Sequence, residues 1–325
     1  MRPKPYRPPF TITSAILDQF AAILMLVGKY EGLSLPPPQP KLRKKNRIQT
    51  VQSTLAIEGN SLSEEQVTAI LEEKRVVGPK RDILEVENAL RVYAESAAFV
   101  AADERHLLRA HKKLMQGLLP DAGRYRTGGV GIIEGSKIRH VAPPAKQVPR
   151  LIAELLSFLK ADHETHLLLK ASIFHYEFEF IHPFADGNGR MGRLWQHVLL
   201  RTFHPIFDHL PFESLIRKNQ AAYYAALREA DRAGDSTPFI EFSLRMIALS
   251  LSEFFEQLRP APLTNEARLE RARAHFRKSE FARKEYTALF KSISDPTASR
   301  DLAHGVAQGQ LVRIGEKARA RYRFR

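Results

Sequence analysis

The chain has 325 residues, of which 44% are hydrophobic, and a formal net charge of +14; this apolar content excludes a disordered protein and allows one large domain or two unequal ones. The absence of cysteine excludes a disulfide framework, a thiolate metal site and a cysteine nucleophile. No run of about 18 apolar residues is present and residues 1–5 lack the apolar core of a signal peptide, so we expect a cytoplasmic protein without membrane contact.

The first third of the chain predicts helices joined by breaker residues. Apolar residues recur at helical spacing, prolines at 36–40 form a stiff connector, and Ser63 with Gln66 forms a capping box. His106 and His111 interrupt apolar faces, and we interpret both as satisfied buried polar groups or surface residues. The helices predicted in this region span residues 14–30, 42–57, 63–74, 82–102 and 104–118.

A basic run, KLRKK at residues 41–45, begins the second of these helices. Such a run could contact nucleic acid, but more often it is the solvated face of a helix start, and we favour the second interpretation.

The interval from 119 to 147 differs from its helical surroundings. Two short β-branched runs, residues 130–133 and 138–141, flank a turn that contains glycine, which predicts a β-hairpin. A lone hairpin in a helical chain leaves an edge free to pair with another strand, so it is either a docking element or a purely structural one.

After the hairpin the pattern becomes helical again. Residues 167–181 are nearly all apolar, which predicts a buried central helix that leads directly into the segment at 182–193. The helices predicted in this part of the chain span residues 148–160, 167–181, 213–233 and 238–259, and Asn219 lies in the third of them.

The segment 182–193, HPFADGNGRMGR, combines an imidazole, a carboxylate, three glycines and two guanidiniums. Glycines let backbone N–H groups approach an anion, and a helix that starts near Asn188 adds its dipole. Asp186 could hold a divalent cation, and His182 could act as a base near neutral pH. Each residue alone has an ordinary interpretation as a turn or helix stop, but together they predict a phosphate site.

This segment resembles the signature of the Fic family, His-Pro-Phe-x-Asp-Gly-Asn-Gly-Arg-x-x-Arg, at every fixed position. The resemblance implies a mainly α fold, in which a Fic helical bundle carries a β-hairpin flap. It also implies transfer of AMP from ATP, with Mg²⁺, to a Tyr, Thr or Ser hydroxyl of a protein. The hairpin, at about residues 128–142, would then hold the target segment by strand addition.

The resemblance also assigns roles within the site. His182 would take the proton of the attacking hydroxyl, and Asp186 would hold Mg²⁺ between the α- and β-phosphates. Asn219 would contact the nucleoside end of ATP. The remaining phosphate contacts would come from the backbone of Gly187, Asn188 and Gly189 and from the side chains of Arg190 and Arg193.

A second motif precedes the signature. Thr54, Glu58 and Gly59 fit the Ser/Thr-x-x-x-Glu-Gly/Asn pattern of Fic proteins that inhibit themselves, at the end of a helix spanning about residues 42–58. The resemblance implies that Glu58 pairs with Arg193 and so competes with the γ-phosphate of ATP. The alternative is an exposed carboxylate beside a helix end.

Residues 263–325 predict a separate appendage of three helices and a two-stranded wing, as in a small winged helix-turn-helix. They carry 15 Lys and Arg against 7 Asp and Glu, whereas residues 51–262 carry 26 against 27. The basic balance permits DNA binding, but the same module also serves as a protein-contact domain, and we weigh the two equally.

We therefore expect an N-terminal helical region at 1–104, a Fic domain at 105–260 and the winged domain at 263–325. The expected partners are a target protein, the protein itself through self-modification, and a second copy or DNA. Three other functions stay open: AMP removal or another phosphate-linked transfer at the same site, a DNA-binding regulator whose Fic domain senses a nucleotide, and the toxin of a toxin–antitoxin pair. A built-in inhibitory motif weakens the last, because it makes a separate inhibitor unnecessary.

Overall fold

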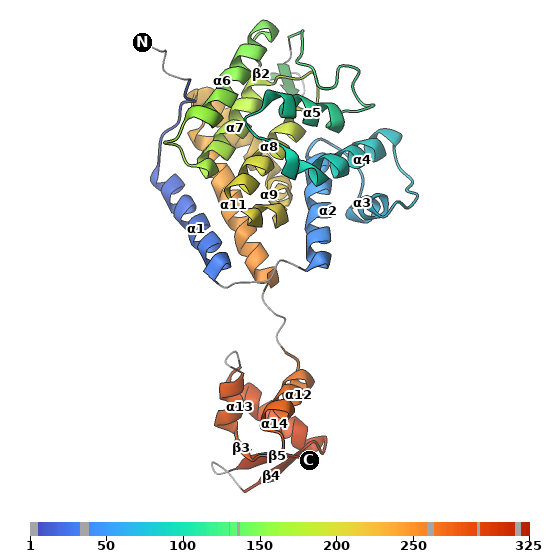
Figure 1. Cartoon of the computed structure of the whole chain (residues 1–325), viewed down its shortest axis with the longest axis vertical. Coiled ribbons are helices and arrows are strands. Elements are labelled where there is room, and N and C mark those ends of the chain that lie inside the picture. The colour runs from blue at the N-terminus through green and yellow to red at the C-terminus, as the bar shows by residue number, and fades with distance from the viewer. Residues whose placement is uncertain are drawn as a thin grey trace. The chain divides into compact units, whose positions relative to one another are not determined.

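The protein is mainly helical and forms two compact units, Met1–Glu256 and Gln257–Arg325 (Figure 1). The computed structural model describes residues 6–32, 39–129, 131–134, 137–258, 263–290, 293–315 and 320–325. The mainly α fold predicted from the sequence is confirmed. None of the described helices has the length and apolar character that crossing a bilayer requires.

Two buried helices form the centre of the first unit. Helix α7 (Leu167–Ile181) and helix α8 (Asn188–Phe203) pack against each other, and only the loop of residues 182–187 separates them in sequence. Both have buried residues on nearly all faces, as expected of helices in the middle of a bundle. The helices around them are α1 (Ser14–Gly32), α2 (Pro40–Ile57), α3 (Glu64–Leu71), α4 (Lys80–Ala94), α5 (Glu104–Leu114), α6 (Val148–Ala161), α9 (Phe212–Lys218), α10 (Gln220–Ala233) and α11 (Thr237–Leu258).

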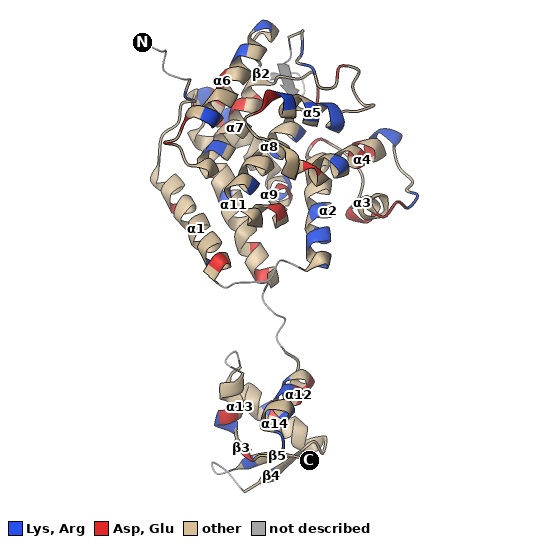
Figure 2. Ribbon diagram, in the orientation of Figure 1, with Lys and Arg blue, Asp and Glu red and all other residues tan. Residues whose placement is uncertain are grey.

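Helix α2 brings a polar face into the unit and packs on α9. Its basic first turns are exposed (Figure 2), and Lys44 pairs with Glu72, which agrees with a solvated helix start. The helix ends as the sequence predicts: Gly59 has φ 93°, which lets the Asn60 N–H reach the carbonyl of Leu55 at 3.1 Å.

Two predicted helices are interrupted well before their expected ends. The segment predicted as one helix at 82–102 ends at Ala94, where Ser96 donates to the Tyr93 carbonyl and a single 3₁₀ turn follows. The helix predicted at 213–233 is two helices, α9 and α10. The break lies at Asn219, whose backbone leaves the helical region with φ −113° and ψ 32°, while its side-chain amide donates to the Leu215 carbonyl.

The hairpin is present in the backbone. Strand β1 (Gly131–Glu134) pairs antiparallel with β2 (Lys137–Val141), with Gly131 opposite Val141 and a register shift between Ile132 and Ile133. Residues 130, 135 and 136 of the predicted flap lie outside the described residues. In the described part of the first unit these are the strands that the structure contains, so the hairpin pairs only with itself.

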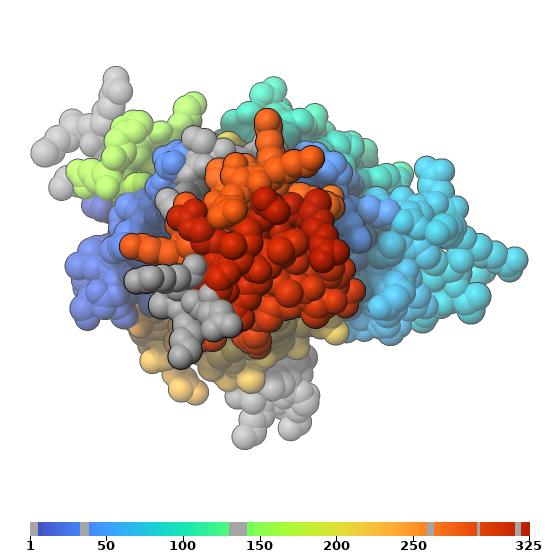
Figure 3. Space-filling view, turned by 90° about the horizontal axis from the view of Figure 1, so that it is seen from below, coloured from blue at the N-terminus to red at the C-terminus, as the bar shows by residue number. Residues whose placement is uncertain are grey.

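The second unit has its own core. Phe281, Tyr286, Leu302 and Phe324 are buried together in this core. The outer surface of the unit is orange and red in the space-filling view (Figure 3). Its sheet has three strands in the order β3-β5-β4, not the two predicted, because Phe281 and Ala282 pair with β5. Its elements are α12 (Asn265–Phe276), β3 (Phe281–Ala282), α13 (Arg283–Leu289), α14 (Asp295–Ala307), β4 (Leu311–Ile314) and β5 (Arg321–Phe324).

Candidate active site

His182 ends helix α7 in a left-handed conformation, with φ 49° and ψ 61°. A non-glycine residue adopts this region at an energetic cost of roughly 1–2 kcal/mol, so the surrounding contacts must hold it there. The imidazole Nδ1 lies 3.3 Å from the Glu179 carbonyl, which can only accept a hydrogen bond. Nδ1 therefore carries the proton, and Nε2 keeps the lone pair that a general base needs.

The loop after His182 is fixed by its own polar groups and by His111. The Asn188 side chain accepts from the Phe184 N–H and donates to the Phe184 carbonyl, both at 2.9 Å. The Phe184 ring stacks on the His111 ring with centroids 3.6 Å apart. His111 accepts from the Gly123 N–H and lies 3.0 Å from the Asp186 carbonyl, and burial lowers its pKa to about 4, so a neutral imidazole braces the loop.

A carboxylate, that of Glu58, lies at the N-terminus of helix α8. A β-carbon at Gly189 would collide with Glu58 Oε1 and would stand 3.2 Å from Arg193 Nη1. The carboxylate of Glu58 therefore lies directly over the first turn of the helix, where free N–H groups and the helix dipole favour negative charge. A side chain at position 189 would have to displace this carboxylate, so glycine permits the close approach.

Arg193 joins the end of helix α2 to the signature segment. Its guanidinium is fully buried and donates to the Thr54 hydroxyl at 2.8 Å, to the Thr54 carbonyl at 3.0 Å and to Glu58 Oε1 at 2.6 Å. Burial alone would lower the pKa of Arg193, but the charge of Glu58 and its hydrogen bond outweigh burial and raise it. The structure thus brings Arg193 to Thr54 and Glu58, which lie 139 and 135 positions before it in the sequence.

A buried carboxyl group lies behind this pair. Glu213 of α9 is fully buried and accepts from the Tyr93 hydroxyl at 3.4 Å. Burial raises the pKa of Glu213 to about 8, so it is mostly protonated at neutral pH. Glu58 is therefore the carboxylate that bonds directly to Arg193, and the buried carboxylate of Glu179 adds negative charge nearby.

Asp186 and Arg190 form a second ionic group. Asp186 pairs with Arg190 at 3.0 Å and with Arg81 of α4 at 3.3 Å, and Arg190 also pairs with Glu85 at 3.1 Å. The Asn60 side chain donates to Glu85 at 2.9 Å, so the end of α2 is linked to Arg190 as well as to Arg193. Each of the three guanidiniums in this region thus pairs with at least one carboxylate.

The donor set around Asp186 suits Mg²⁺ bound together with a phosphate. The side chain of Asp186 is 42% exposed, and no group of three or more His, Asp or Glu in the described part of the chain forms a complete metal cage. Mg²⁺ commonly takes one or two protein carboxylates and completes its shell with phosphate oxygens and water.

Asn219 is not bonded to the other predicted site residues in the interactions that the structure records for it. It is exposed and its side chain closes the last turn of α9. Its neighbour Gln220 donates to the Ile57 carbonyl at 3.0 Å and so reaches the end of α2 beside Glu58.

The structure adds contact residues that the sequence analysis did not single out. Glu85 could have been suspected, because a glutamate beside Val86 on the apolar face of a helix needs a buried partner. Arg81, Arg126 and Glu213 gave no comparable signal, because their partners come from distant segments.

A crystal structure of a Fic family protein from Desulfovibrio desulfuricans G20 is 41% identical to this chain and superimposes with a TM-score of 0.74 over 98% of both chains. The chain belongs to the Fic family. The Fic/DOC family profile matches residues 101–200, which contain the hairpin and the signature. Fic-1 of C. elegans (residues 134–508) shares the fold, with a TM-score of 0.60 and 22% identity over 75% of this chain and 73% of that one.

Relatives named as enzymes are more distant from this Fic protein. The protein adenylyltransferase Fic of Nematostella vectensis is 28% identical over 251 residues, which is 73% of this chain and 56% of that protein. The protein adenylyltransferase fic-1 of Caenorhabditis briggsae is 30% identical over 220 residues, 63% of this chain and 40% of that protein. The chain thus matches about half the length of these relatives, and the likeness supports a transfer activity of this general type.

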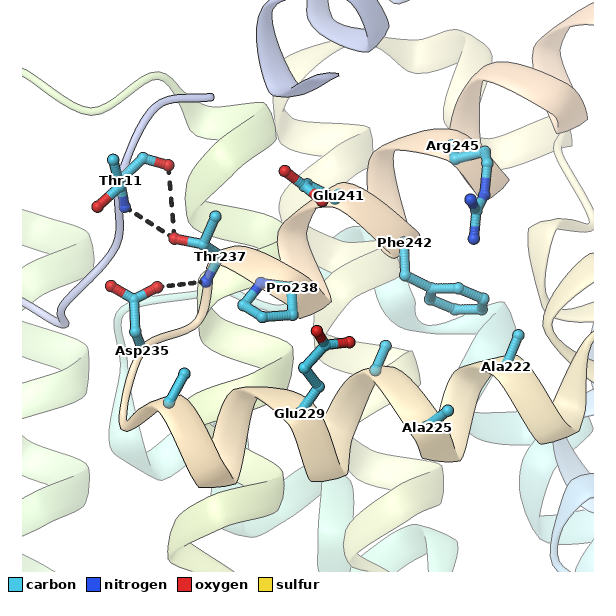
Figure 4. Close-up of a pocket in the computed structure, with 12 residues that line it drawn as sticks. Thr11, Ala222, Ala225, Glu229, Asp235, Thr237, Pro238, Glu241, Phe242 and Arg245 are labelled. Carbon is cyan, nitrogen blue, oxygen red and sulfur yellow. Dashed lines mark hydrogen bonds between the residues drawn. The ribbon is translucent and has the colours of Figure 1, made fainter. Parts of the chain in front are cut away.

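A separate pocket of about 650 Å³ lies between the N-terminal segment, α10 and α11 (Figure 4). Thr11, Ala225, Glu229, Glu241 and Arg245 are among its lining residues, and none of the signature residues is. Its carboxylate at Glu241 accepts from the Thr13 hydroxyl at 2.6 Å. The pocket is therefore set apart from the groups that could carry the chemistry.

Proposed function

We propose that this Fic protein is a protein adenylyltransferase, which moves AMP from ATP to a Tyr, Thr or Ser hydroxyl of a protein, and that Glu58 holds it in an inhibited state. One observation carries the proposal: a carboxylate lies over the N-terminus of α8, paired with a fully buried arginine. A place that holds one anion in this way is suited to a phosphate. The relatives named protein adenylyltransferases support the same activity.

The nucleotide would replace Glu58. The backbone N–H groups of Gly187, Asn188 and Gly189 would receive the inner phosphates, and the guanidiniums of Arg190 and Arg193 would balance the outer ones. Mg²⁺ held by Asp186 would neutralise phosphate charge. Arg193 can serve this purpose because its geometry is already set by the two bonds to Thr54.

His182 would act on the attacking hydroxyl. The imidazole is partly exposed, and its Nε2 lone pair is free because Nδ1 is committed to the Glu179 carbonyl. It would take the hydroxyl proton as the oxygen attacks the α-phosphorus and pyrophosphate leaves. A positioned base of this kind contributes about 10²- to 10⁴-fold to a rate.

Inhibition follows from competition for Arg193. With Glu58 in place, the three guanidiniums of the site are already matched by carboxylates. The γ-phosphate must therefore compete with Glu58 for Arg193, and a charge-assisted pair with a buried arginine is a strong competitor. ATP then binds poorly, or binds with its α-phosphate turned away from the hydroxyl.

The hairpin would present the target. Its backbone pairs only within itself in the described residues, so one edge is available for an added strand. Strand addition uses main-chain hydrogen bonds, which suits a segment that carries the hydroxyl to His182.

Labelled ATP tests the reaction type. The protein and its Glu58→Gly variant are incubated in parallel with ATP labelled at the α- or the γ-phosphorus, and protein-bound label is counted. Label transferred only from the α position supports AMP transfer. Transfer only from the γ position means a kinase-like reaction, and release of AMP from a premodified sample without any uptake of label means AMP removal.

A further inference from the structure

Arg126 donates to the backbone on both sides of the signature histidine. Its N–H donates to the Pro183 carbonyl at 2.9 Å, its Nε donates to the His182 carbonyl at 2.7 Å, and its Nη2 donates to the Ile181 carbonyl at 3.2 Å. Three consecutive carbonyls are therefore bonded to one residue, from a segment more than 50 positions earlier in the chain.

These carbonyls lie at the C-terminal end of α7, where a helix has unpaired acceptors and the negative end of its dipole. Arg126 is only 6% exposed, and among the residues that the structure describes it forms no ion pair with a carboxylate. Among the described residues, backbone carbonyl dipoles compensate its charge, which is how a cation can cap a helix end. The contact fixes the backbone of His182 in its left-handed conformation.

The same guanidinium reaches both ends of the hairpin. Nη1 donates to the Gly128 carbonyl at 2.9 Å, just before β1, and Nη2 donates to the Pro143 carbonyl at 2.6 Å, just after β2. Arg126 thus joins three backbone segments at one point: the entry to the hairpin, its exit, and the residues around His182. A planar fork with five donors can do this, and a lysine cannot.

We propose that Arg126 is a positioning residue of the reaction: it ties the docking hairpin to the backbone of His182, so that a strand bound on the hairpin presents its hydroxyl to the imidazole. The role rests on the proposed transfer activity. It acts on geometry alone, because Arg126 contacts neither the Glu58 and Arg193 pair nor the Asp186 group in the bonds that the structure records for it.

The kinetic test uses full-length protein in the Glu58→Gly background, with self-modification by α-labelled ATP as the assay. Arg126→Ala should lower the rate at saturating ATP by about 100-fold, because a misplacement of about 1 Å near the chemistry has that effect. The ATP concentration for half-maximal rate should change by no more than about twofold, because no phosphate contact is lost. Arg124→Ala, two residues earlier and exposed, is the matched control and should behave as the parent.

Rescue distinguishes positioning from general loss of structure. Added guanidinium at millimolar concentration should restore part of the rate in Arg126→Ala and none in His182→Ala. Only Arg126→Ala leaves a cavity lined by the carbonyls that the guanidinium bonded. Arg126→Lys should recover less than the rescued protein, because an ammonium cannot reach all four side-chain acceptors. If Arg126→Ala fails to fold, Arg126→Lys carries the same kinetic comparison, and a parent-like rate in either variant overturns the proposal.

Hydrogen exchange separates this inference from the proposed function. In the absence of nucleotide, Arg126→Ala or Arg126→Lys should exchange faster than the parent in peptides covering 127–145 and 180–186, and in no peptide of α2. That result supports the coupling even if no label is ever transferred. Unchanged exchange in both peptides, or a parallel fall of rate and ATP affinity, would overturn it.

Discussion

Two arginines hold the signature loop, and their partners differ in kind. Arg193 is paired with a carboxylate on another element, at the contact between α2 and α8. In the described part of the chain Arg126 is bonded to backbone carbonyls, at the contact between the hairpin base and α7. A carboxylate can be exchanged for a phosphate of like charge, but a backbone carbonyl cannot leave its place. The first contact is suited to regulation and the second to fixed geometry.

The largest loss of transfer activity is expected from His182→Ala, which removes the imidazole that the Arg126 contact positions. Transfer should fall by about 10²- to 10⁴-fold, because the base is lost. ATP affinity, measured by calorimetry in the Glu58→Gly background, should be unchanged because the phosphate contacts lie elsewhere. Wild-type transfer in this variant would mean that His182 is not the base.

Asp186→Ala tests the carboxylates that a phosphate could replace. Asp186 is the exposed carboxylate between Arg81 and Arg190, so its loss should remove the Mg²⁺-dependent part of ATP affinity, by at least about tenfold. Titration of ATP with and without Mg²⁺ measures this part. Asp82→Ala, on the same helix as Arg81, is the control and should keep it. Unchanged Mg²⁺ dependence in Asp186→Ala would remove Asp186 from the site.

A proline in the hairpin tests the part of the site whose geometry Arg126 fixes. Ile138→Pro removes a backbone donor from β2, opposite Ile133, and disturbs the strand that would pair with a target. Modification of a protein target should fall by about tenfold or more, the size expected for misplaced reactants, with ATP affinity nearly unchanged. Equal losses of both would show that the hairpin is a folding element.

The smallest effect is expected from Glu213, the buried carboxyl group near Arg193, on the pH dependence of stability. Glu213 has a folded-state pKa of about 8, above the ordinary value of 4.5. The folded protein therefore holds this proton more tightly, and its contribution to stability, full at pH 4, is lost as pH rises through 8. Glu213→Gln stays neutral and should lose this dependence.

Thermal unfolding from pH 5 to pH 9 measures the difference. The melting temperature of Glu213→Gln relative to wild type should rise between these limits by roughly 2–4 °C for each kcal/mol that the lost proton is worth. Parallel curves for the two proteins would show that Glu213 titrates normally.

The sequence predicted the fold class and the position of α7 and the signature, because an apolar run and a dense polar motif are local signals. It also predicted the end of α2, which Gly59 and Asn60 determine locally. It did not predict the break at Asn219, where the backbone leaves the helical region, nor strand β3, whose two residues form a strand only through β5.

Some residues of the candidate site could be predicted from the sequence, and others could not. The residues of 182–193 are consecutive and could be chosen from their order. Arg126, Arg81 and Glu213 act through partners that only the tertiary structure supplies, and their neighbours in sequence give no sign of them. The pairing of Glu58 with Arg193 was expected from the family resemblance, and the distance of 2.6 Å agrees with it.

The central claim is that Glu58 restrains the site, and self-modification of Glu58→Gly with α-labelled ATP tests it most directly. Wild type, Glu58→Gly, the double variant with His182→Ala, and Glu72→Gly are compared at equal concentration. Glu72 is the matched control, because it also ends a helix, with backbone angles of −91° and 12° against −91° and 6° for Glu58, but pairs with two lysines outside the site.

Label in Glu58→Gly should exceed that in wild type by about 5- to 150-fold, the range of typical coupling between a restraint and a binding site. Glu72→Gly should match wild type, and the double variant should take up no label. If Glu58→Gly is folded and binds ATP but is no more active than wild type, the carboxylate over α8 does not inhibit the enzyme and the account is wrong.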